Sequence, residues 1–451
     1  MTVIYAKTAL LPEGWAQDVA VTLHAGRIAE VRVGVASNQQ LACLLPAVAN
    51  LHSHTFQRAM AGMTEYRSAG QDSFWTWRSL MYRFLDRLTP QDVQAIAAMV
   101  MVEMAEAGYG AMAEFHYLHH GVNGARYDNL AEMSLQIAAA AAETGLGLTH
   151  LPVLYERGGC DGRALAAGQL RFGNSPEQFA KLWQATQAAL RDLPGDTVLG
   201  VAPHSLRAAS AEGIALAANL DPEAPVHIHV AEQIAEVEEV LAATGARPVQ
   251  GLLDQQAVSE RWCLIHATQM LPSETEALAR SGAIAGLCPI TEANLGDGIF
   301  DGARFLAAGG RFGVGSDSNV RISLNAELRL LEYSQRLGLR ARAVLAREGQ
   351  SVGRVLYQGA ALGGAQAAGR AAGAIKVGLW ADLMALECSG PDLAASSGDM
   401  ILDTFVFAAG EGVVAEVWSA GRHIVTKGRH LAREAVRARY AQTVVRLRAA
   451  L

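Results

Sequence analysis

Leu45-Pro-Ala-Val-Ala-Asn-Leu-His-Ser-His54 is an apolar run that ends in two histidines separated by a single residue. On a β-strand, residues two apart point the same way, so His52 and His54 would present both imidazoles to one point. Neutral imidazole nitrogens suit zinc and neighbouring transition metals. Such a pair also occurs by chance, so its interpretation depends on where the other histidines and carboxylates fall.

Seven further apolar runs follow, separated by helical patterns rich in Ala, Leu and Glu. The eight runs are Leu45–His54, Gly110–Tyr117, Leu148–Tyr155, Thr197–Ser205, Pro225–Glu232, Arg261–Ala267, Gly282–Pro289 and Arg311–Asp317. Helices are expected at Pro90–Ala107, Asn129–Glu143, Pro176–Leu190, Ile234–Thr244 and Pro272–Arg280. Eight strand–helix units in a row predict an α/β fold, a parallel (β/α)8 TIM barrel.

The two ends of the chain have a different pattern. Residues 1–35 are typical of short strands with a hairpin turn at His24-Ala25-Gly26. Further strands are predicted at Asp382–Glu387, Thr404–Ala408, Val413–Ser419 and Gly421–Val425, before a charged helical pattern at the C-terminus. We therefore predict a catalytic barrel over residues 45–369 and a small β-sandwich domain with a C-terminal helix, built from residues 1–44 and 370–451.

Composition argues against several classes of protein. The 451 residues are 51% hydrophobic and 18% charged, which is ample for a large core. A net charge of −7 without a Lys/Arg-rich run argues against nucleic-acid binding. No apolar stretch reaches the roughly 18 residues of a spanning helix, and the N-terminus lacks a signal-like region. The five cysteines never form Cys-x-x-Cys, which favours reduced thiols and a cytoplasmic location.

Polar residues recur where the predicted strands end. They are His52, His54, Glu114, His116, Tyr117, His204, Ser205, Arg207, His229, Glu232, His266 and Asp317. A barrel carries its chemistry at the carboxyl ends of its strands, so these side chains should meet at one rim. This convergence predicts a metal-dependent active site.

Four of these residues are candidate metal ligands. A catalytic zinc takes about three or four protein ligands and keeps an open position for water. His52, His54, His229 and Asp317 offer three imidazoles and one carboxylate. His227 lies one layer deeper, and a hydrogen-bonded core histidine is its favoured interpretation. For Asp317 the alternative is a turn or helix-capping aspartate.

Glu232 and His266 are candidate catalytic residues. Glu232 follows His229 by three residues, so its carboxylate can carry protons beside the metal without ligating it. His266 can polarise the attacked group or hold the water. The alternatives are a solvated glutamate at a helix start and a structural histidine.

Together these motifs resemble the amidohydrolase superfamily. They include His52-Ser-His54, His229-Val-Ala-Glu232, Ser316-Asp-Ser318 and a late Gly378-Leu-Trp-Ala-Asp382-Leu segment. Two-metal members typically bridge their ions with a carboxylated lysine, and residues 150–155 and 198–205 contain none. Its absence favours the mononuclear deaminase branch. The resemblance implies one Zn²⁺ per chain, and the donor set does not exclude Fe²⁺.

Within that branch, the chain is similar to the formimidoylglutamate deiminases. The segments that carry this similarity are residues 50–60, 74–78, 114–120, 202–207 and 227–233. It implies hydrolysis of N-formimino-L-glutamate to N-formyl-L-glutamate and ammonia in histidine degradation, with Asp317, His266 and Glu232 catalytic. It also assigns substrate contact to Gln57, Arg78, Tyr117, His204 and Arg207. Arginine suits the two carboxylates of that substrate, although Arg78 alone is equally consistent with a surface residue.

Two other functions stay open at this point. A related deaminase acting on a purine, pyrimidine or other amidine-like substrate would share every metal residue, but it would not need two arginines. A barrel that has lost catalysis and serves as a binding protein would usually lose metal ligands. The aromatic segment Met60–Arg87, interpreted as a long loop, can reach a partner barrel, so a homodimer is expected.

Overall fold

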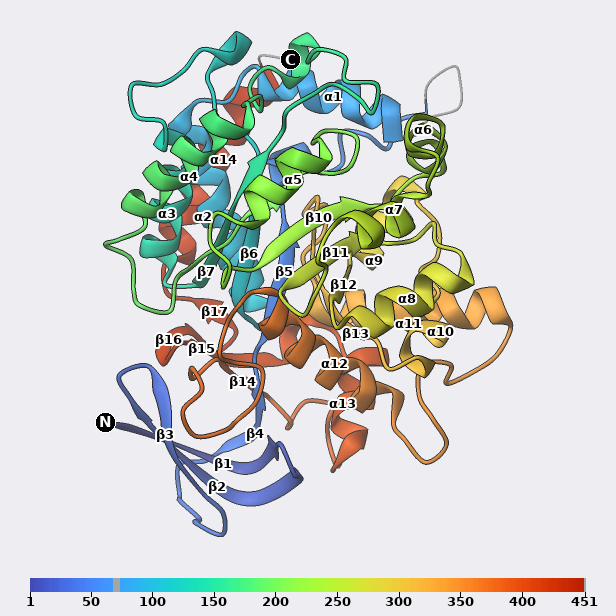
Figure 1. Cartoon of the computed structure of the whole chain (residues 1–451). Helices are drawn as coiled ribbons and strands as arrows, with labels where there is room; N and C mark the ends of the chain where they lie inside the picture. The colour runs from blue at the N-terminus through green and yellow to red at the C-terminus, as the bar shows by residue number, and fades with distance from the viewer. Residues whose placement is uncertain (68–73, 450–451) are drawn as a thin grey trace.

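The computed structural model describes residues 1–67 and 74–449, and two sheets of parallel strands flanked by helices occupy its centre (Figure 1). The first sheet contains β5 (Val48–Ser53), β6 (Tyr109–His116), β7 (Gly147–Leu154), β8 (Val198–Leu199) and β9 (Ala202–Pro203), which pairs with β7. The second contains β10 (Val226–Val230), β11 (Trp262–His266), β12 (Ile284–Leu287) and β13 (Arg311–Val314). Each of the eight predicted runs therefore overlaps a strand, and the run Thr197–Ser205 holds two short ones, β8 and β9.

Parallel backbone bridges join the two sheets at both seams. Ser53 pairs with Asp317, and the amide of Asp317 donates to the carbonyl of His52 at 2.9 Å. At the other seam, Val201 pairs with Val226 and Ser205 with His229. The strands of both sheets thus end on the same side, which brings the residues that follow them together.

Helices connect successive strands. Their bounds are α1 (Phe74–Leu85), α2 (Pro90–Glu106), α3 (Glu132–Thr144), α4 (Pro176–Ala189), α5 (Ala211–Ala218), α6 (Ile234–Thr244), α7 (Pro248–Gln255), α8 (Pro272–Ser281), α9 (Pro289–Leu295), α10 (Gly302–Ala307), α11 (Leu324–Leu339) and α12 (Val352–Ala367), with 3₁₀ turns η1 (Thr55–Met60), η2 (Val122–Gly124) and η3 (Ala167–Gln169). At α2, the Thr89 hydroxyl accepts from the Asp92 amide while Pro90 occupies the first turn. Such local signals explain why the predicted helices lie close to the observed ones.

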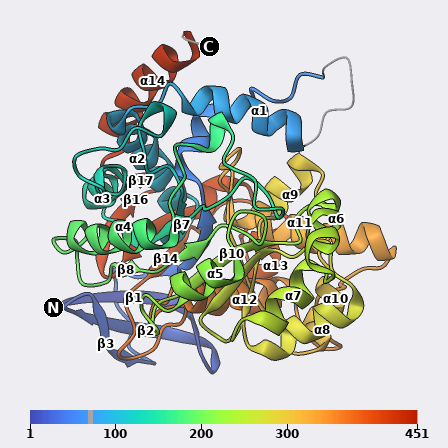
Figure 2. The same ribbon diagram turned by 45° about the horizontal axis from the view of Figure 1, so that its top comes forward.

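The chain ends share one eight-stranded sheet in the order β17-β16-β15-β14-β4-β1-β2-β3. Its strands are β1 (Thr2–Leu11), β2 (Gly14–His24), β3 (Arg27–Arg32), β4 (Leu41–Pro46), β14 (Leu383–Leu386), β15 (Val414–Ser419), β16 (Arg422–Thr426) and β17 (Arg429–His430). The turn η4 (Glu411–Val413) precedes β15. Helix α14 (Arg433–Ala449) packs against α2, as Figures 1 and 2 both show.

Two predicted elements differ from the structure. Thr404–Ala408 is not a strand; it overlaps α13 (Asp399–Phe407). Its buried residues Ile401, Leu402, Phe405 and Val406 recur with a helical period, and tertiary packing against α12 outweighs the local β preference of Phe-Val-Phe. The aromatic segment 60–87 is not loop throughout, because α1 occupies much of it, while its residues 68–73 lie outside the described part.

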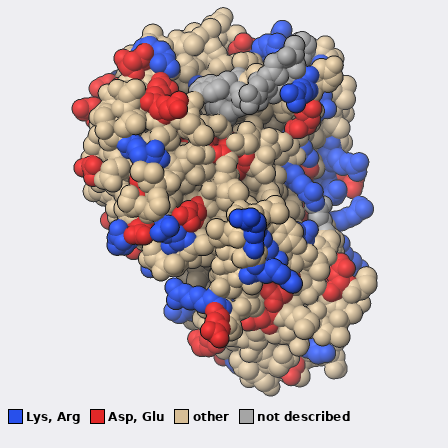
Figure 3. Space-filling model, turned by 90° about the vertical axis from the view of Figure 1, so that its right-hand side faces the viewer, with Lys and Arg blue, Asp and Glu red and all other residues tan. Residues whose placement is uncertain are grey.

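The surface carries charges of both signs. On the face drawn in Figure 3, Lys and Arg side chains are interspersed with Asp and Glu rather than gathered in one track. None of the helices in the described residues is long and apolar enough to cross a membrane.

Candidate metal-dependent active site

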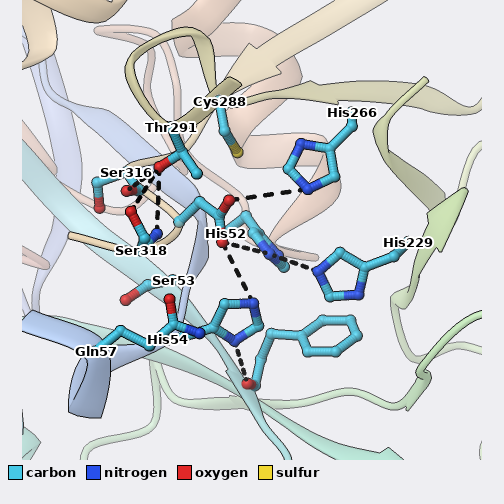
Figure 4. A network of polar contacts seen from close by, with 12 residues as sticks. His52, Ser53, His54, Gln57, His229, His266, Cys288, Thr291, Ser316 and Ser318 are labelled. Atoms are coloured by element: carbon cyan, nitrogen blue, oxygen red, sulfur yellow. Dashed lines mark hydrogen bonds and ion pairs between the residues drawn. The ribbon is translucent and has the colours of Figure 1, made fainter. Parts of the chain in front are cut away.

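Three histidines and one aspartate converge where β5, β10 and β13 end. Figure 4 shows the rings of His52, His54 and His229 turned toward one centre. Nε2 of His54 lies 3.3 Å from Oδ1 of Asp317, and Nε2 of His52 lies 3.5 Å from the same oxygen. Nε2 of His229 lies 3.1 Å from Nε2 of His52. The four predicted ligands, all buried, therefore form one compact group.

Hydrogen bonds on the far side of two rings decide which nitrogen faces the centre with a lone pair. Nδ1 of His54 lies 3.0 Å from the carbonyl of Phe115, and Nδ1 of His229 lies 3.2 Å from that of His204. A carbonyl only accepts, so each Nδ1 carries the proton and each Nε2 directs a lone pair inward. Burial also lowers the pKa of His52 to about 3, which keeps its ring neutral. These donors fit a divalent transition metal.

Asp317 completes the donor set with a carboxylate that stays ionised. Burial alone would raise its pKa, but the hydrogen bond from His52 and the charge of the nearby His266 hold the pKa below its usual value. Its backbone has φ +46°, and that of His266 has φ +69°, a left-handed region that costs about 1–3 kcal/mol per non-glycine residue. Strained backbone at both positions aims the two side chains into the site.

A buried amide and hydroxyl network fixes the Asp317 loop to β5. Asn50 donates to the Ser316 hydroxyl at 2.7 Å, and Ser316 donates to Asn319 at 2.6 Å. The Asn319 amide donates to the Ser53 hydroxyl at 3.1 Å. Neither Asn50 nor Asn319 is among the predicted site residues; for Asn50, a polar residue inside an apolar strand was the available signal.

His266 lies among carboxylates on the other side of Asp317. Its Nε2 is 3.7 Å from Glu232 and 3.8 Å from Asp317, while its Nδ1 is 3.3 Å from Glu292. Burial would lower the pKa of His266, but Glu232 and the other carboxylates raise it well above its usual value. Burial raises the pKa of Glu232 to about 7. A carboxyl with such a pKa can both give and take a proton near neutrality.

A cavity opens beside this group, and all five predicted substrate-contact residues line it. They are Gln57, Arg78, Tyr117, His204 and Arg207, together with Tyr82, Tyr155, Phe172, Glu232 and others. Arg78 donates to the Tyr155 hydroxyl at 3.0 Å and also contacts Tyr82. Arg207 is 7% exposed, and its Nε has no hydrogen-bond partner among the described residues. The cavity thus combines two guanidinium groups with the histidine centre.

Other polar residues fall outside the centre or were missed. His227 hydrogen bonds through Nε2 to the carbonyl of Ala367 at 2.8 Å, in agreement with its interpretation as a core histidine. Glu292 and Asp297 lie beside His266 and Glu232 but received no role from the sequence. Glu292 lies four residues after Cys288, just past a predicted strand end, and that position was its only sequence signal.

The chain is similar to known proteins over nearly its whole length. The amidohydrolase family matches residues 43–424, and the N-terminal domain of formimidoylglutamate deiminase HutF matches residues 1–39. A formimidoylglutamate deiminase of Pseudomonas aeruginosa is 49% identical over 96% of this chain and 97% of the relative. A 5-methylthioadenosine/S-adenosylhomocysteine deaminase of Natronomonas pharaonis is 25% identical over 84% of this chain and 82% of its own length.

Solved structures give a matching result. A crystal structure of an amidohydrolase from Brucella melitensis superposes with a TM-score of 0.96 at 48% identity, covering 99% of this chain and all of the other. An adenosine deaminase from Xanthomonas campestris with bound zinc superposes with a TM-score of 0.81 at 22% identity, covering 99% of this chain and 98% of its own. The second likeness supports the fold alone.

Proposed function

Because this chain belongs to the amidohydrolase family, and within it to the formimidoylglutamate deiminases, we propose that it hydrolyses N-formimino-L-glutamate to N-formyl-L-glutamate and ammonia in histidine degradation. It is a hydrolase that acts on C–N bonds other than peptide bonds. The observation that carries the choice of substrate is the pair of arginines, Arg78 and Arg207, in the cavity beside the histidine centre.

We propose one Zn²⁺ ion per chain, held by His52, His54, His229 and Asp317, although Fe²⁺ suits the same donors. Support comes from the inward lone pairs of His54 and His229 and from the ionised carboxylate of Asp317. When bound, the ion supplies an acidic water, because coordination lowers the pKa of water from 15.7 to about 7.

Three side chains then handle the protons. Asp317 takes a proton from the attacking water, and His266 holds that water toward the formimino carbon. The water oxygen bonds to this carbon, and Glu232 passes a proton to the imino nitrogen. The proton on Asp317 then reaches the same nitrogen, and the hydroxyl of the adduct returns a proton to Glu232. The C–N bond to that nitrogen breaks, ammonia leaves, and the carbonyl of the formyl group forms with both carboxyl groups back in their starting states. The carboxylates of Glu232 and Asp317 both lie within 4 Å of Nε2 of His266.

The remaining cavity residues orient the substrate. The guanidinium groups of Arg207 and Arg78 match its two carboxylates, since arginine offers paired donors to each carboxylate. Gln57 donates to the Tyr117 hydroxyl at 2.8 Å, which fixes both side chains at the cavity wall. His204 lies next to them, with its ring centroid 5.9 Å from that of Tyr117.

We propose further that the two parallel sheets are halves of one (β/α)8 barrel over residues 45–369. The backbone bridges at both seams support this closure. We also propose that the eight-stranded sheet of residues 1–44 and 370–451 curls into a small β-sandwich. A separate apolar cluster on that sheet supports it, formed by residues such as Ile4, Val19, Ile28, Leu383 and Trp418. The homodimer and the cytoplasmic location remain proposals from sequence; light scattering tests the first.

Ammonia release from a small substrate panel tests the function. The purified, zinc-loaded enzyme should release ammonia from N-formimino-L-glutamate and much less from guanine, cytosine or adenosine. Faster release from a purine would favour the related deaminase activity, a reaction suggested by the methylthioadenosine relatives. A protein that binds no zinc and turns over none of these compounds would instead support a non-catalytic binding role.

A further inference from the structure

A short helix, α9, lies between two parts of the proposed site. It begins directly after β12, and its first turn contacts both His266 and the Asp317 loop. None of its residues is among the predicted site residues. Its Glu292 is the residue through which it reaches His266, so the contacts of that carboxylate decide what α9 can do.

Glu292 is a buried carboxylate with a fixed orientation. It is 5% exposed, and its Oε1 accepts the backbone N–H of Cys288 at 2.8 Å. The same oxygen lies 3.3 Å from Nδ1 of His266. Because the same oxygen makes both contacts, the backbone at the start of α9 fixes the position of the oxygen that contacts the His266 ring.

The first turn of α9 is itself anchored by neighbouring elements. The amide of Ile290 donates to the carboxylate of Glu327, a fully buried residue of α11, at 2.9 Å. The Thr291 hydroxyl lies 2.9 Å from that of Ser318, in the loop that carries Asp317 (Figure 4). The turn therefore has little freedom to shift relative to either side of the site.

His266 depends on such an anchor. Its Nε2 contacts to Glu232 and Asp317, at 3.7 and 3.8 Å, are too long to be hydrogen bonds that orient the ring. Of these three carboxylates, Glu292 comes nearest to the ring, at 3.3 Å from the opposite nitrogen. A hydrogen bond at Nδ1 sets both the orientation of an imidazole and the chemical state of its other nitrogen.

We propose that Glu292 is a positioning residue for the reaction: by accepting a hydrogen bond from Nδ1, it keeps Nε2 of His266 directed at the space between Glu232 and Asp317. It neither touches substrate nor ligates metal. This role rests on the proposed function, since it concerns the turnover of that reaction. It also explains why a carboxylate is buried at the beginning of α9.

The test compares three variants at Glu292 in the full chain loaded with zinc. In Glu292→Leu, which removes the acceptor, kcat should fall at least roughly 30-fold while KM stays within about threefold and zinc content is unchanged. In Glu292→Gln, the amide oxygen can still accept from Cys288 and His266, so kcat should stay within about fivefold of wild type. Glu292→Asp keeps the charge but retracts it by one methylene, so kcat should fall about tenfold.

Glu274 provides a matched control. It is 2% exposed, lies at the start of α8 and accepts the backbone N–H of Leu271. Its other hydrogen-bond partners among the described residues are Arg247 and Gln250, which lie outside the site. Glu274→Leu should lower the melting temperature and leave kcat of the folded enzyme unchanged.

Several results would overturn the proposal. They are an unchanged kcat in Glu292→Leu, equal losses of kcat in the Gln and Leu variants, or lost zinc as the cause of inactivity. If Glu292→Leu does not fold, an unchanged kcat in Glu292→Asp overturns it. Wild-type enzyme that releases no ammonia from N-formimino-L-glutamate would refute the proposed function instead, so the two failures are distinguishable.

Discussion

Two buried polar clusters lie at opposite ends of the parallel strands, and their pairing differs. The histidine centre is at the carboxyl ends, where ring nitrogens of His52 and His229 face each other at 3.1 Å. The second, which we name the Arg370 cluster, contains Arg370, Asp196, Asp382 and Arg422. Asp196 precedes β8, and Asp382 precedes β14, so this cluster joins the amino ends of the strands to the sheet of the chain ends.

The Arg370 cluster is saturated by its own partners. Arg370 donates to Asp382 at 2.6 Å and to Asp196 at 2.8 Å, and Arg422 donates to both oxygens of Asp196 at 2.7 Å. Asp382 also accepts the backbone N–H of Ala420 at 2.6 Å. The histidine centre instead directs lone pairs and a carboxylate at one point. A cluster that is complete within the protein stabilises the fold, whereas inward donors fit an external cation.

The largest effect is expected from a substitution that breaks the Arg370 cluster. Arg370→Met leaves two buried carboxylates short of a partner, so the unfolding free energy should fall by about 3–5 kcal/mol. Urea unfolding measures this, and kcat of the remaining folded enzyme should not change. A loss below about 1 kcal/mol would show that the cluster contributes little to stability.

Glu232→Gln changes the histidine centre at the carboxyl ends of the strands, and it should affect catalysis and not stability. Loss of the proton carrier should lower kcat by about 10²–10⁴-fold, with zinc content and unfolding free energy as in wild type. Steady-state ammonia release and metal analysis on the same preparation check it. Full turnover in this variant would remove Glu232 from the proton transfer.

Arg207→Met tests whether a residue of the cavity recognises the substrate's carboxylate and takes no part in the chemical step. Loss of a charge-assisted hydrogen bond costs about 1.5–3 kcal/mol, so kcat/KM for N-formimino-L-glutamate should fall roughly 10- to 150-fold. A neutral formamidine without carboxylates should be affected less. Equal losses for both substrates would indicate that Arg207 does not recognise a carboxylate.

The smallest effect concerns the Ser419 hydroxyl beside the Arg370 cluster, where it accepts a hydrogen bond from Arg422 at 3.3 Å. The Ser419 hydroxyl accepts the buried backbone N–H of Gly147, the first residue of β7, at 2.8 Å. Ser419→Ala should destabilise the protein by about 1–3 kcal/mol without changing kcat. Ser397→Ala, at an exposed position, is the control and should shift the melting temperature little. Equal shifts in the two variants would contradict the role given to Ser419.

Sequence alone predicted the strands of the two parallel sheets and most of the histidine centre because both follow local rules. Strands covered on both faces read as short apolar runs, and each polar residue at a run's end is placed by the direction of its strand. His52, His54, His229, His266 and Asp317 were all identified in this way. Their prediction needed no knowledge of which strand lies beside which.

Tertiary structure decided what depends on distant partners. Phe405-Val406 favours a strand locally, yet packing against α12 makes α13 a helix. Arg370 and Asp196 are 174 residues apart, and no periodicity relates them. Glu292 reaches His266 from another strand's loop. Local periodicity records which face of an element is buried. A contact between residues far apart in the sequence forms only when the whole chain is packed. The sequence by itself therefore determined the metal-donor side chains, and the tertiary structure decided which distant residues they and the other buried polar groups contact.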